Sequence, residues 1–409
     1  MKTLRMPQVL IGSATGLPYP DDYFDAVFTD PPYYINVPYA DLSDFFYVWL
    51  KRTVGDLYPD LFTTPLTPKS REIGQMAHWD LERYAEKDKQ WFEEMLTRAF
   101  REIHRVLKPE GVAVIVFAYP KTEAWEAVIN AILNAGLYLT ASWPIHTEMG
   151  ARLNAQETAA LASSIYMVCR KRTTEEVGEY SRVREELQKV LPERLAELWQ
   201  QGISGADFSM AAIGPAVEIF GRYARVEKLS GEAVSVGELL NLARRITSEF
   251  ALRQILKDGH LAGVDNVTQF YLLWRWNYGR GLVPFDEAHK LALSVGVDLE
   301  LLSRQGLAKK NGSYLRLLGP QDRRFTGKEV PENLVDALQL AALYWAQGKE
   351  QELEELLASL SCSLETFWRV AQAIADRLPD GDKERQLLHG LLGRRNGARL
   401  WEQRLPYDQ

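Results

Sequence analysis

The stretch that most constrains the fold of this chain is residues 23–34, YFDAVFTDPPYY. The apolar residues 26–28 are β-branched and aromatic and predict a short buried strand. Pro31 and Pro32 end that strand, because they fix φ and carry no N–H. We therefore expect Asp30 and the carbonyls of Asp30 and Pro31 at the carboxyl end of a strand. Open α/β sheets bind their ligands at that edge.

This group of atoms suits chemistry on an aromatic amine. The amine of a nucleobase is a poor nucleophile, because its lone pair is delocalised into the ring. The Asp30 carboxylate and the Pro31 carbonyl could accept its two N–H bonds and draw the nitrogen towards a tetrahedral form. Tyr33 offers a flat face for a flipped-out base, and the prolines, Pro32 included, hold both acceptors in place. The alternative is a Pro-Pro turn after a core strand, with Asp30 as a surface cap.

Asp-Pro-Pro-Tyr after an apolar strand resembles the signature of amino-group DNA methyltransferases that use S-adenosylmethionine, chiefly the adenine-specific ones. Asp at the first position favours adenine in a nucleic acid. Asn is typical of protein-glutamine and some RNA enzymes, and Ser of many cytosine enzymes. Residues 33–50, YYINVPYADLSDFFYVWL, are similar to one subgroup, the large prokaryotic adenine-specific methylases with an N-terminal domain of unknown function. Residues 203–224 and 271–281 resemble the same subgroup, so the resemblance covers most of the chain.

The resemblance implies S-adenosylmethionine as cofactor and residues 30–33 as the catalytic loop. It also implies that the short segment before the catalytic strand passes beside the adenine of the cofactor. Ser13 and Ala14 are the expected contacts, with a plain surface turn as the alternative. Gly12 does not begin a loop for the methionine part of the cofactor. It stands too close to Asp30 for a crossover helix and two further strands.

Four further residues are candidates for contacts with the substrate. Tyr34 and Asn36 lie in the loop before the next expected helix and could line the pocket for the base. Residues 53–89 look like an insertion, with three prolines in its first half followed by Lys69 and Arg71. Such a stretch is often a lid or a binding loop, and it could clamp the target strand. An ordinary solvated loop is the alternative.

The predicted fold class is α/β, with a partial Rossmann-like methyltransferase sheet in residues 1–172 and a mostly α-helical region in residues 173–409. In the first part we expect strands at 8–11, 26–28, 112–117, 137–143 and 164–169 and helices at 41–50, 91–107 and 122–134. The last two strands would form an antiparallel hairpin, and the residues 108–111 would end a helix. Residues 41–44 would cap the helix that follows them, and its aromatic side chains would lie in a core.

The second part reads as helices, with a possible role in target recognition or partner contact. We expect them at 185–200, 208–223, 236–257, 266–278, 285–295, 334–346, 351–358 and 364–377. Basic clusters occur at Arg170-Lys171-Arg172, Lys309-Lys310, Arg323-Arg324 and Arg394-Arg395. Each cluster is more often a solvated face than a phosphate contact.

The net charge of −7 argues against a generally basic surface, so binding of DNA must rest on local patches. The two cysteines and six scattered histidines show no ligand spacing, and we predict no metal site. The sequence contains no apolar run long enough to span a membrane, so we expect no membrane partner. A cytoplasmic location is the default expectation.

Two features of such enzymes are absent from the sequence. These are a glycine-rich turn of the type Phe-x-Gly-x-Gly after a strand, and an acidic residue that ends the next strand. The chain therefore resembles the downstream part of a larger enzyme: one polypeptide of a split methylase, a gene fragment or a mispredicted start. A half sheet leaves an apolar edge uncovered, which favours a second chain that carries the glycine-rich loop. The alternative functions are a DNA-binding or regulatory subunit without catalysis, and a methylase of RNA.

Overall fold

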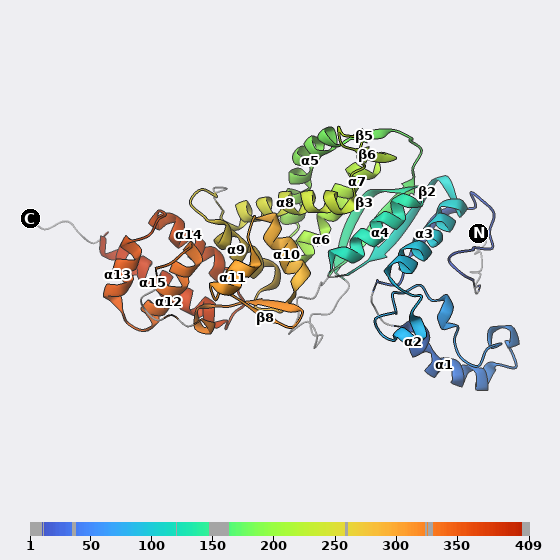
Figure 1. Ribbon diagram of the computed structural model, residues 1–409, viewed down its shortest axis with the longest axis horizontal. Helices are drawn as coiled ribbons and strands as arrows, with labels where there is room; N and C mark the ends of the chain where they lie inside the picture. Colours follow the sequence, from blue (N-terminus) through green and yellow to red (C-terminus); the bar gives the residue numbers. More distant parts are fainter. Residues whose placement is uncertain are drawn as a thin grey trace, which may run out of the picture. The chain divides into compact units, whose positions relative to one another are not determined.

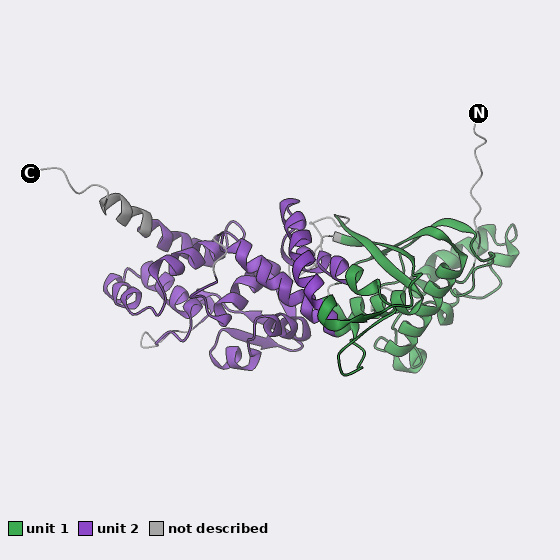
Figure 2. Ribbon diagram, turned by 90° about the horizontal axis from the view of Figure 1, so that it is seen from above, with its two compact units in different colours: residues 1–145, 164–183, 217–237 green, residues 146–163, 184–216, 238–409 purple. Residues whose placement is uncertain are grey.

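The structure, a computed structural model, describes residues 10, 12–34, 38–119, 121–146, 163–257, 261–323, 325 and 330–402. It forms two compact units. The first contains residues 1–145, 164–183 and 217–237, and the second contains residues 146–163, 184–216 and 238–409 (Figure 2). The units interleave along the chain, so that 173–183 and 217–237, which we had assigned to the helical region, belong to the first unit. The expected strand at 8–11 and Asn36 lie outside the described residues.

A mixed four-stranded sheet forms the centre of the first unit. Its strands are β1 (Phe24–Thr29), β2 (Leu107–Phe117), β3 (Leu137–His146) and β4 (Ser163–Lys171). The strand order is β1-β2-β4-β3, with β1 parallel to β2 and β4 antiparallel to β2. The predicted α/β class is therefore confirmed at the level of a mixed α/β fold, and the last two strands are neighbours as expected.

Two amphipathic helices cover one face of this sheet, α3 (Lys89–Val106) and α4 (Thr122–Asn134), as Figure 1 shows. Both helices agree with the sequence prediction, because their apolar residues recur at helical spacing. In the middle of β2 buried and half-buried residues alternate, and Ala113 and Ile115 are among the buried ones. The intervening Val112 and Val114 are only half-buried, so the other face is less completely covered.

Residues 108–111 belong to β2 rather than to a turn. Phe24 of β1 pairs with Leu107, but Ala26 pairs with Val112, so the register between the strands shifts here. The extra residues of β2 are accommodated as an irregularity at the start of the strand. Pro109 and Gly111 indicated a break in regular structure, and the break lies inside the strand.

The predicted strand at 26–28 is present as β1, but the expectation that it is buried is wrong. β1 lies at the edge of the sheet, and none of its residues is buried. Phe28 is 66% exposed and contacts Tyr166 of β4, with ring centroids 5.9 Å apart. The apolar sequence of β1 is therefore left uncovered by the residues that the structure describes.

Helix α1 (Tyr39–Val54) also differs from the prediction. It begins two residues before the expected cap cluster, with Pro38 at the N-cap and no capping side chain. None of its residues is buried, although we expected its aromatic residues in a core. Phe45 and Trp49 are each more than half exposed. Hydrophobicity alone predicted burial, and the described chain supplies no surface to cover these side chains.

The segment that follows α1 is irregular, as predicted. It contains two short 3-10 helices, η1 (Pro59–Leu61) and η2 (Lys69–Arg71), and one turn of helix, α2 (Leu81–Tyr84). The hydroxyl of Thr67 donates to Asp44 of α1 at 2.6 Å, and the backbone amide of Gln75 donates to the carbonyl of Tyr34 at 3.1 Å. The insertion is therefore folded against α1 and the loop after β1 rather than free in solution.

The rest of the described chain is mainly helical. Its helices are α5 (Tyr180–Gln200), α6 (Gly205–Ala211), α7 (Ile213–Gly221), α8 (Val236–Ile255), α9 (Asn266–Tyr278), α10 (Phe285–Ser294), α11 (Leu299–Arg304), η4 (Pro320–Asp322), α12 (Leu334–Ala346), α13 (Glu350–Ala358), α14 (Leu364–Ala375) and α15 (Lys383–Glu402). The single helix expected at 208–223 is divided into α6 and α7. The sequence analysis missed α11 and α15.

Two small sheets were also missed. β5 (Val177–Glu179) pairs in parallel with β6 (Arg225–Glu227) in the first unit. The second unit has a three-stranded sheet of order β7-β9-β8, made of β7 (Val283–Pro284), β8 (Ala308–Asn311) and β9 (Tyr314–Leu317). The pair β8 and β9 is a hairpin around Gly312, whose φ of +61° suits glycine. Asn-Gly between two short strands is a hairpin signal that could have been recognised.

The core of the second unit contains a buried ion pair. Arg275 of α9 lies 2.9 Å from Glu384 of α15, and both side chains are almost fully buried. The hydroxyl of Tyr271 donates to the same carboxylate at 2.5 Å and accepts from Arg275 at 2.7 Å. Removing one member would leave a charge buried without its partner, which makes this network a fixed point of the unit. Across the described residues, no helix is both long and apolar enough to cross a membrane.

Candidate functional site

Asp30 directly follows the last residue of β1, at the carboxyl end of the two parallel strands. Thr29 pairs with Ile115 of β2, so both strands end close to this point. Asp30 is exposed, whereas Pro31 is buried and Pro32 is half-buried. The two prolines are thus held in the protein while the carboxylate faces outwards, which is the arrangement expected for a group that contacts a ligand.

Tyr33 lies close to Asp30 and is anchored at both ends. Its ring packs edge-to-face on Phe117 at the end of β2, with centroids 5.2 Å apart. Its hydroxyl interacts with Asp30 and with Ser164 of β4. Burial raises the pKa of Tyr33, the negative charge and hydrogen bond of Asp30 raise it further, and the Ser164 hydroxyl, as a donor, acts in the opposite direction. Tyr33 therefore stays a neutral donor that holds the Asp30 carboxylate.

The contact between the Tyr33 hydroxyl and Asp30 was not part of the sequence prediction. That prediction assigned Tyr33 only a stacking face. The charge of Asp30 and the Ser164 hydroxyl both act on the Tyr33 hydroxyl, which gives this hydroxyl a polar role beside the stacking role of the ring. No sequence signal could have revealed Ser164, which lies far along the chain on another strand.

Tyr34, which we expected in a pocket for the base, lies in the core. It is 2% exposed, and its ring packs edge-to-face on Phe92 of α3. Its hydroxyl donates to Glu123 of α4 at 2.8 Å. Burial, followed by the hydrogen bond to Glu123, raises the pKa of Tyr34. Tyr34 therefore anchors the catalytic loop to α3 and α4, and it presents no face to a ligand in this structure.

Lys69 is also committed to the fold. Its ammonium group lies 2.6 Å from the carboxylate of Asp44, and its side chain is only 14% exposed. The hydrogen bond from Lys69, with help from Thr67, lowers the pKa of Asp44 to about 2. Lys69 is thus not available to a phosphate group. Arg71 is exposed and makes no hydrogen bond or ion pair within the described residues, so it alone of this pair remains free for such a contact.

A buried lysine that the sequence analysis overlooked organises the insertion. Lys87 is 1% exposed, and its ammonium group donates to the carbonyls of Lys69 and Glu72 at 2.5 and 2.7 Å. It also lies over the rings of Tyr84 and Trp91. Burial lowers the pKa of Lys87. One side chain near the end of the insertion is therefore joined to the backbone of its middle part.

Ser13 and Ala14 lie in an exposed turn. The amide of Gly16 donates to the carbonyl of Ser13 at 3.1 Å, and the amide of Leu17 donates to Glu102 near the end of α3. No described hydrogen bond, ion pair or ring contact joins this turn to the catalytic loop. The turn offers exposed backbone and the hydroxyls of Ser13 and Thr15, which could form at most an edge of a cofactor site. These residues do not by themselves enclose S-adenosylmethionine.

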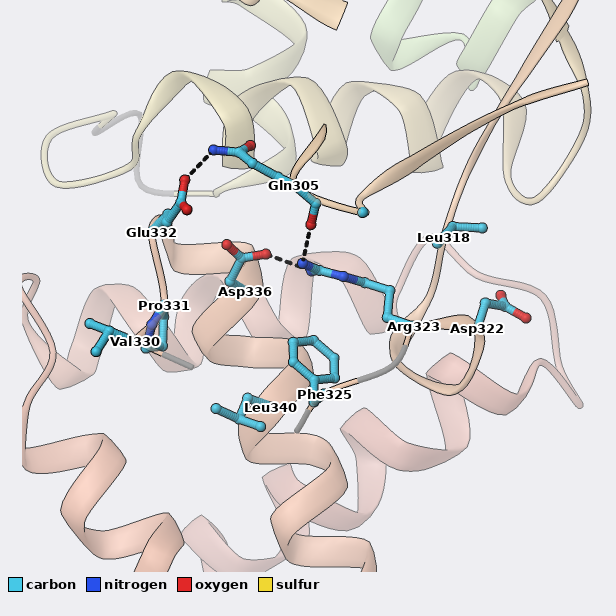
Figure 3. Close-up of a pocket in the computed structure, with 11 residues that line it drawn as sticks. Gln305, Leu318, Asp322, Arg323, Phe325, Val330, Pro331, Glu332, Asp336 and Leu340 are labelled. Atoms are coloured by element: carbon cyan, nitrogen blue, oxygen red, sulfur yellow. Dashed lines mark hydrogen bonds and ion pairs between the residues drawn. The ribbon is translucent and has the colours of Figure 1, made fainter. Parts of the chain in front are cut away.

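Most of the basic clusters are used within the fold. Lys171 pairs with Asp22 at 2.6 Å, and Arg394 pairs with Glu354 at 2.9 Å. Arg323 extends along a cavity of about 350 Å³ and binds Asp336 at 2.5 Å, as Figure 3 shows. Arg323 is thus a structural cation of the second unit.

A comparison of the chain with protein-family models, with curated proteins and with solved structures found no match. Within the described part of the chain, no group of three or more His, Cys, Asp or Glu side chains could hold a metal ion.

Proposed function

We propose that this chain carries the catalytic loop of an S-adenosylmethionine-dependent methyltransferase that acts on the exocyclic amine of adenine in DNA. The observation that supports this most is the place of Asp30. Its exposed carboxylate stands at the carboxyl end of the parallel strands β1 and β2, behind two prolines that the protein holds in place. A further support is the neighbouring pair β3 and β4, which agrees with the second half of a Rossmann-like methyltransferase sheet.

The chain's own residues would prepare the amine. The Asp30 carboxylate accepts one N–H and the Pro31 carbonyl accepts the other, so the nitrogen lone pair is drawn out of the ring. The Tyr33 hydroxyl keeps the Asp30 carboxylate in position, which limits reorganisation during the reaction. The cofactor, when bound, supplies the methyl group as an electrophile. The methylated nitrogen then loses a proton, for which Asp30 and the solvent that it faces are the nearest acceptors.

We further propose that a second polypeptide supplies the glycine-rich cofactor loop. The exposed edge strand β1 and the uncovered aromatic helix α1 support this proposal. A parallel strand added beside β1 would pair its free backbone groups and cover Phe28. The proposed partner is therefore an α/β polypeptide, whose own apolar strand and helices would complete this sheet.

A methyl-acceptor assay tests the activity. The chain, alone and with such a partner, is incubated with labelled S-adenosylmethionine and with DNA or RNA of the same sequence. We expect label in adenine of DNA only, and its loss in Asp30→Ala. Asp25→Ala is the matched control, because Asp25 is an exposed carboxylate of the same strand, paired with Lys108.

Turnover that survives Asp30→Ala would show that the catalytic assignment is wrong. Label in RNA alone would favour the RNA methylase. Binding of DNA without any methyl transfer in the completed assembly would favour the regulatory subunit. In each case the Asp25→Ala control should match the parent chain.

A further inference from the structure

The second unit contains an open groove with an unusual share of cations. It has a volume of about 900 Å³ and lies between the turn after α9, the β8–β9 hairpin and the residues before α15. Its charged lining consists of four basic and two acidic residues, namely Arg280, Lys309, Lys310, Arg316, Asp322 and Asp382. The lining therefore carries a net charge of +2, in a chain whose net charge is −7.

Both carboxylates of the groove are already engaged. Asp322 lies 2.5 Å from Arg280 and 3.6 Å from Arg316. The carboxylate of Asp382 accepts a hydrogen bond from the backbone amide of Glu384 at 2.7 Å and so caps α15. The same side chain lies 3.7 Å from Arg280. These contacts partly neutralise the two arginines, and they leave no carboxylate of the groove free to pair with the lysines of the hairpin.

Lys309 and Lys310 have no carboxylate partner within the described residues. Both are exposed, and the one recorded contact of the Lys310 ammonium group is with the ring of Phe285, at 4.9 Å from the centroid. Both cations of this cluster are therefore free of ion pairs with the residues that the structure describes. A ligand with negative charge can therefore approach them without first breaking an ion pair.

The register of the hairpin places like charges side by side. Lys309 of β8 is directly opposite Arg316 of β9. Like charges at opposed positions of an antiparallel pair destabilise it. The Nε atom of Arg316 is also buried and has no hydrogen-bond acceptor. An anion bound between the two side chains would relieve the repulsion and supply the missing acceptor.

The backbone around the groove is fixed by the core. Gly279 ends α9 with φ +54° and ψ −119°, a conformation that a side chain would strain. Its carbonyl accepts from the buried Arg275 at 2.9 Å. The chain then turns so that Arg280 reaches the groove. The cation is thus presented by a preorganised turn rather than by a flexible tail.

We propose that this groove binds the phosphodiester backbone of DNA. Phosphate oxygens are strong acceptors for Arg and Lys, and neutralising successive phosphates releases counterions. The groove is open and larger than a single phosphate needs, which suits a continuous polyanion. The choice of DNA rests on the proposed function, since the chemistry alone specifies phosphate groups. The groove would position the duplex and read no sequence.

Salt-dependent binding of a labelled DNA duplex to the full chain tests this proposal. The test variant is Lys309→Gln/Lys310→Gln. The matched control is Lys189→Gln/Lys349→Gln, which removes two exposed lysines elsewhere in the unit, one of them also over an aromatic ring. We expect the test variant to lose roughly tenfold or more in affinity and its salt slope to fall by about 2, because two phosphate contacts are lost. The control should match the parent chain.

Three results would overturn the proposal. The first is equal affinity of the parent chain and the test variant for DNA, and the second is binding of an RNA duplex but not of DNA. The third is displacement of the labelled duplex by inorganic phosphate as effectively as by unlabelled DNA with the same concentration of phosphate groups. The thermal midpoint of the test variant should equal or exceed that of the parent, because the repulsion at Lys309 is removed. A lower midpoint would contradict the like-charge argument.

The readout is independent of catalysis. A chain that binds DNA through the groove but transfers no methyl group would leave this inference intact and remove the proposed activity. If the parent chain transfers methyl groups and Lys309→Gln/Lys310→Gln binds DNA as tightly as the parent chain does, the proposed activity stands and this inference fails.

Discussion

The carboxylate of Asp30 and the hydroxyl of Tyr33 belong to the loop at residues 30–33. Burial raises the pKa of Tyr33 and the negative charge of the exposed Asp30 raises it further, so the hydroxyl stays neutral beside that carboxylate. The same hydroxyl is supported by Ser164. One residue of the motif thus presents the acceptor, and the other contributes both a ring and a positioning hydroxyl.

Substitutions at Tyr33 separate these two contributions. Tyr33→Phe keeps the ring on Phe117 and loses the hydrogen bond to Asp30, so we expect kcat to fall by up to about tenfold, with KM for DNA nearly unchanged. Tyr33→Ala should cost more, because loss of a base stack adds about 1–3 kcal/mol. Steady-state kinetics of both variants in the completed assembly measure the difference. Equal losses in the two variants would contradict a stacking role for the ring.

Tyr34 gives a prediction on pH. Its pKa is raised in the fold by burial and by Glu123, whereas in the unfolded chain it ionises near pH ~10. The unfolded chain therefore loses a proton first, and stability falls as pH rises above that value, by up to about 1.4 kcal/mol per pH unit for this residue. Tyr34→Phe should flatten this fall, while at neutral pH it costs about 1 kcal/mol for the lost hydrogen bond.

Urea denaturation on both sides of pH ~10 measures the effect of Tyr34→Phe. Tyr58→Phe is the control, because Tyr58 is 55% exposed and lies in the insertion. If the two variants and the parent chain lose stability equally at high pH, Tyr34 is not the buried hydroxyl that the structure indicates.

At the scale of elements, β1 and α1 share one property: both are apolar and neither has a buried residue. A strand at the edge of a sheet offers free N–H and C=O groups, and an apolar edge invites pairing with another chain. α1 adds exposed aromatic side chains to the same unit. These two elements are where we expect the proposed partner to bind.

Replacing Phe28 with Lys tests the open edge. Phe28 is 66% exposed, so Phe28→Lys should preserve the fold while placing a charge on the surface that another strand would cover. We expect the lone variant to self-associate less than the parent chain in light scattering at rising concentration. Leu229→Lys is the control, because Leu229 is 90% exposed in a turn away from the sheet. An equal effect of the two substitutions would mean that β1 is not a docking edge.

Prediction from the sequence succeeded where an element has its own periodicity. α4, α9 and α12 were predicted with their observed bounds, because their apolar residues recur at helical spacing and cap or glycine signals flank them. The hairpin of β8 and β9 was missed, since its strands are four residues long and carry lysines where apolar residues would indicate a strand.

Within the site, local sequence predicted where Asp30 lies, since a strand and two prolines determine it. Contacts between distant segments were not predictable. Tyr34 pairs with Glu123 across 89 positions, and Lys69 pairs with Asp44 across 25. From the sequence, both Tyr34 and Lys69 could contact a ligand. In the structure, their polar groups are already bound to carboxylates of the same chain. The burial of α1 was mispredicted for a related reason: the surface that would cover it is not part of the described chain.

At the scale of the whole molecule, the two units divide the proposed work. The first presents an acceptor pair at the edge of a sheet, and the second presents a basic groove. Neither, in its described residues, shows an enclosed place for S-adenosylmethionine, and the exposed turn at Ser13 and Ala14 is the one expected contact. The proposed methyltransferase site would then need a glycine-rich turn, a motif that is absent from the printed sequence.

Calorimetry of cofactor binding tests this division. The chain alone should bind S-adenosylmethionine weakly or not at all, because an exposed turn provides little buried contact. Adding a protein that carries Phe-x-Gly-x-Gly after a strand should restore binding and yield a heteromer with a largely apolar interface. Phe28→Lys should prevent the restoration, whereas Asp30→Ala should allow it, since Asp30 contacts the amine rather than the partner. Tight binding by the lone chain would contradict the proposal and place a whole cofactor site within this chain.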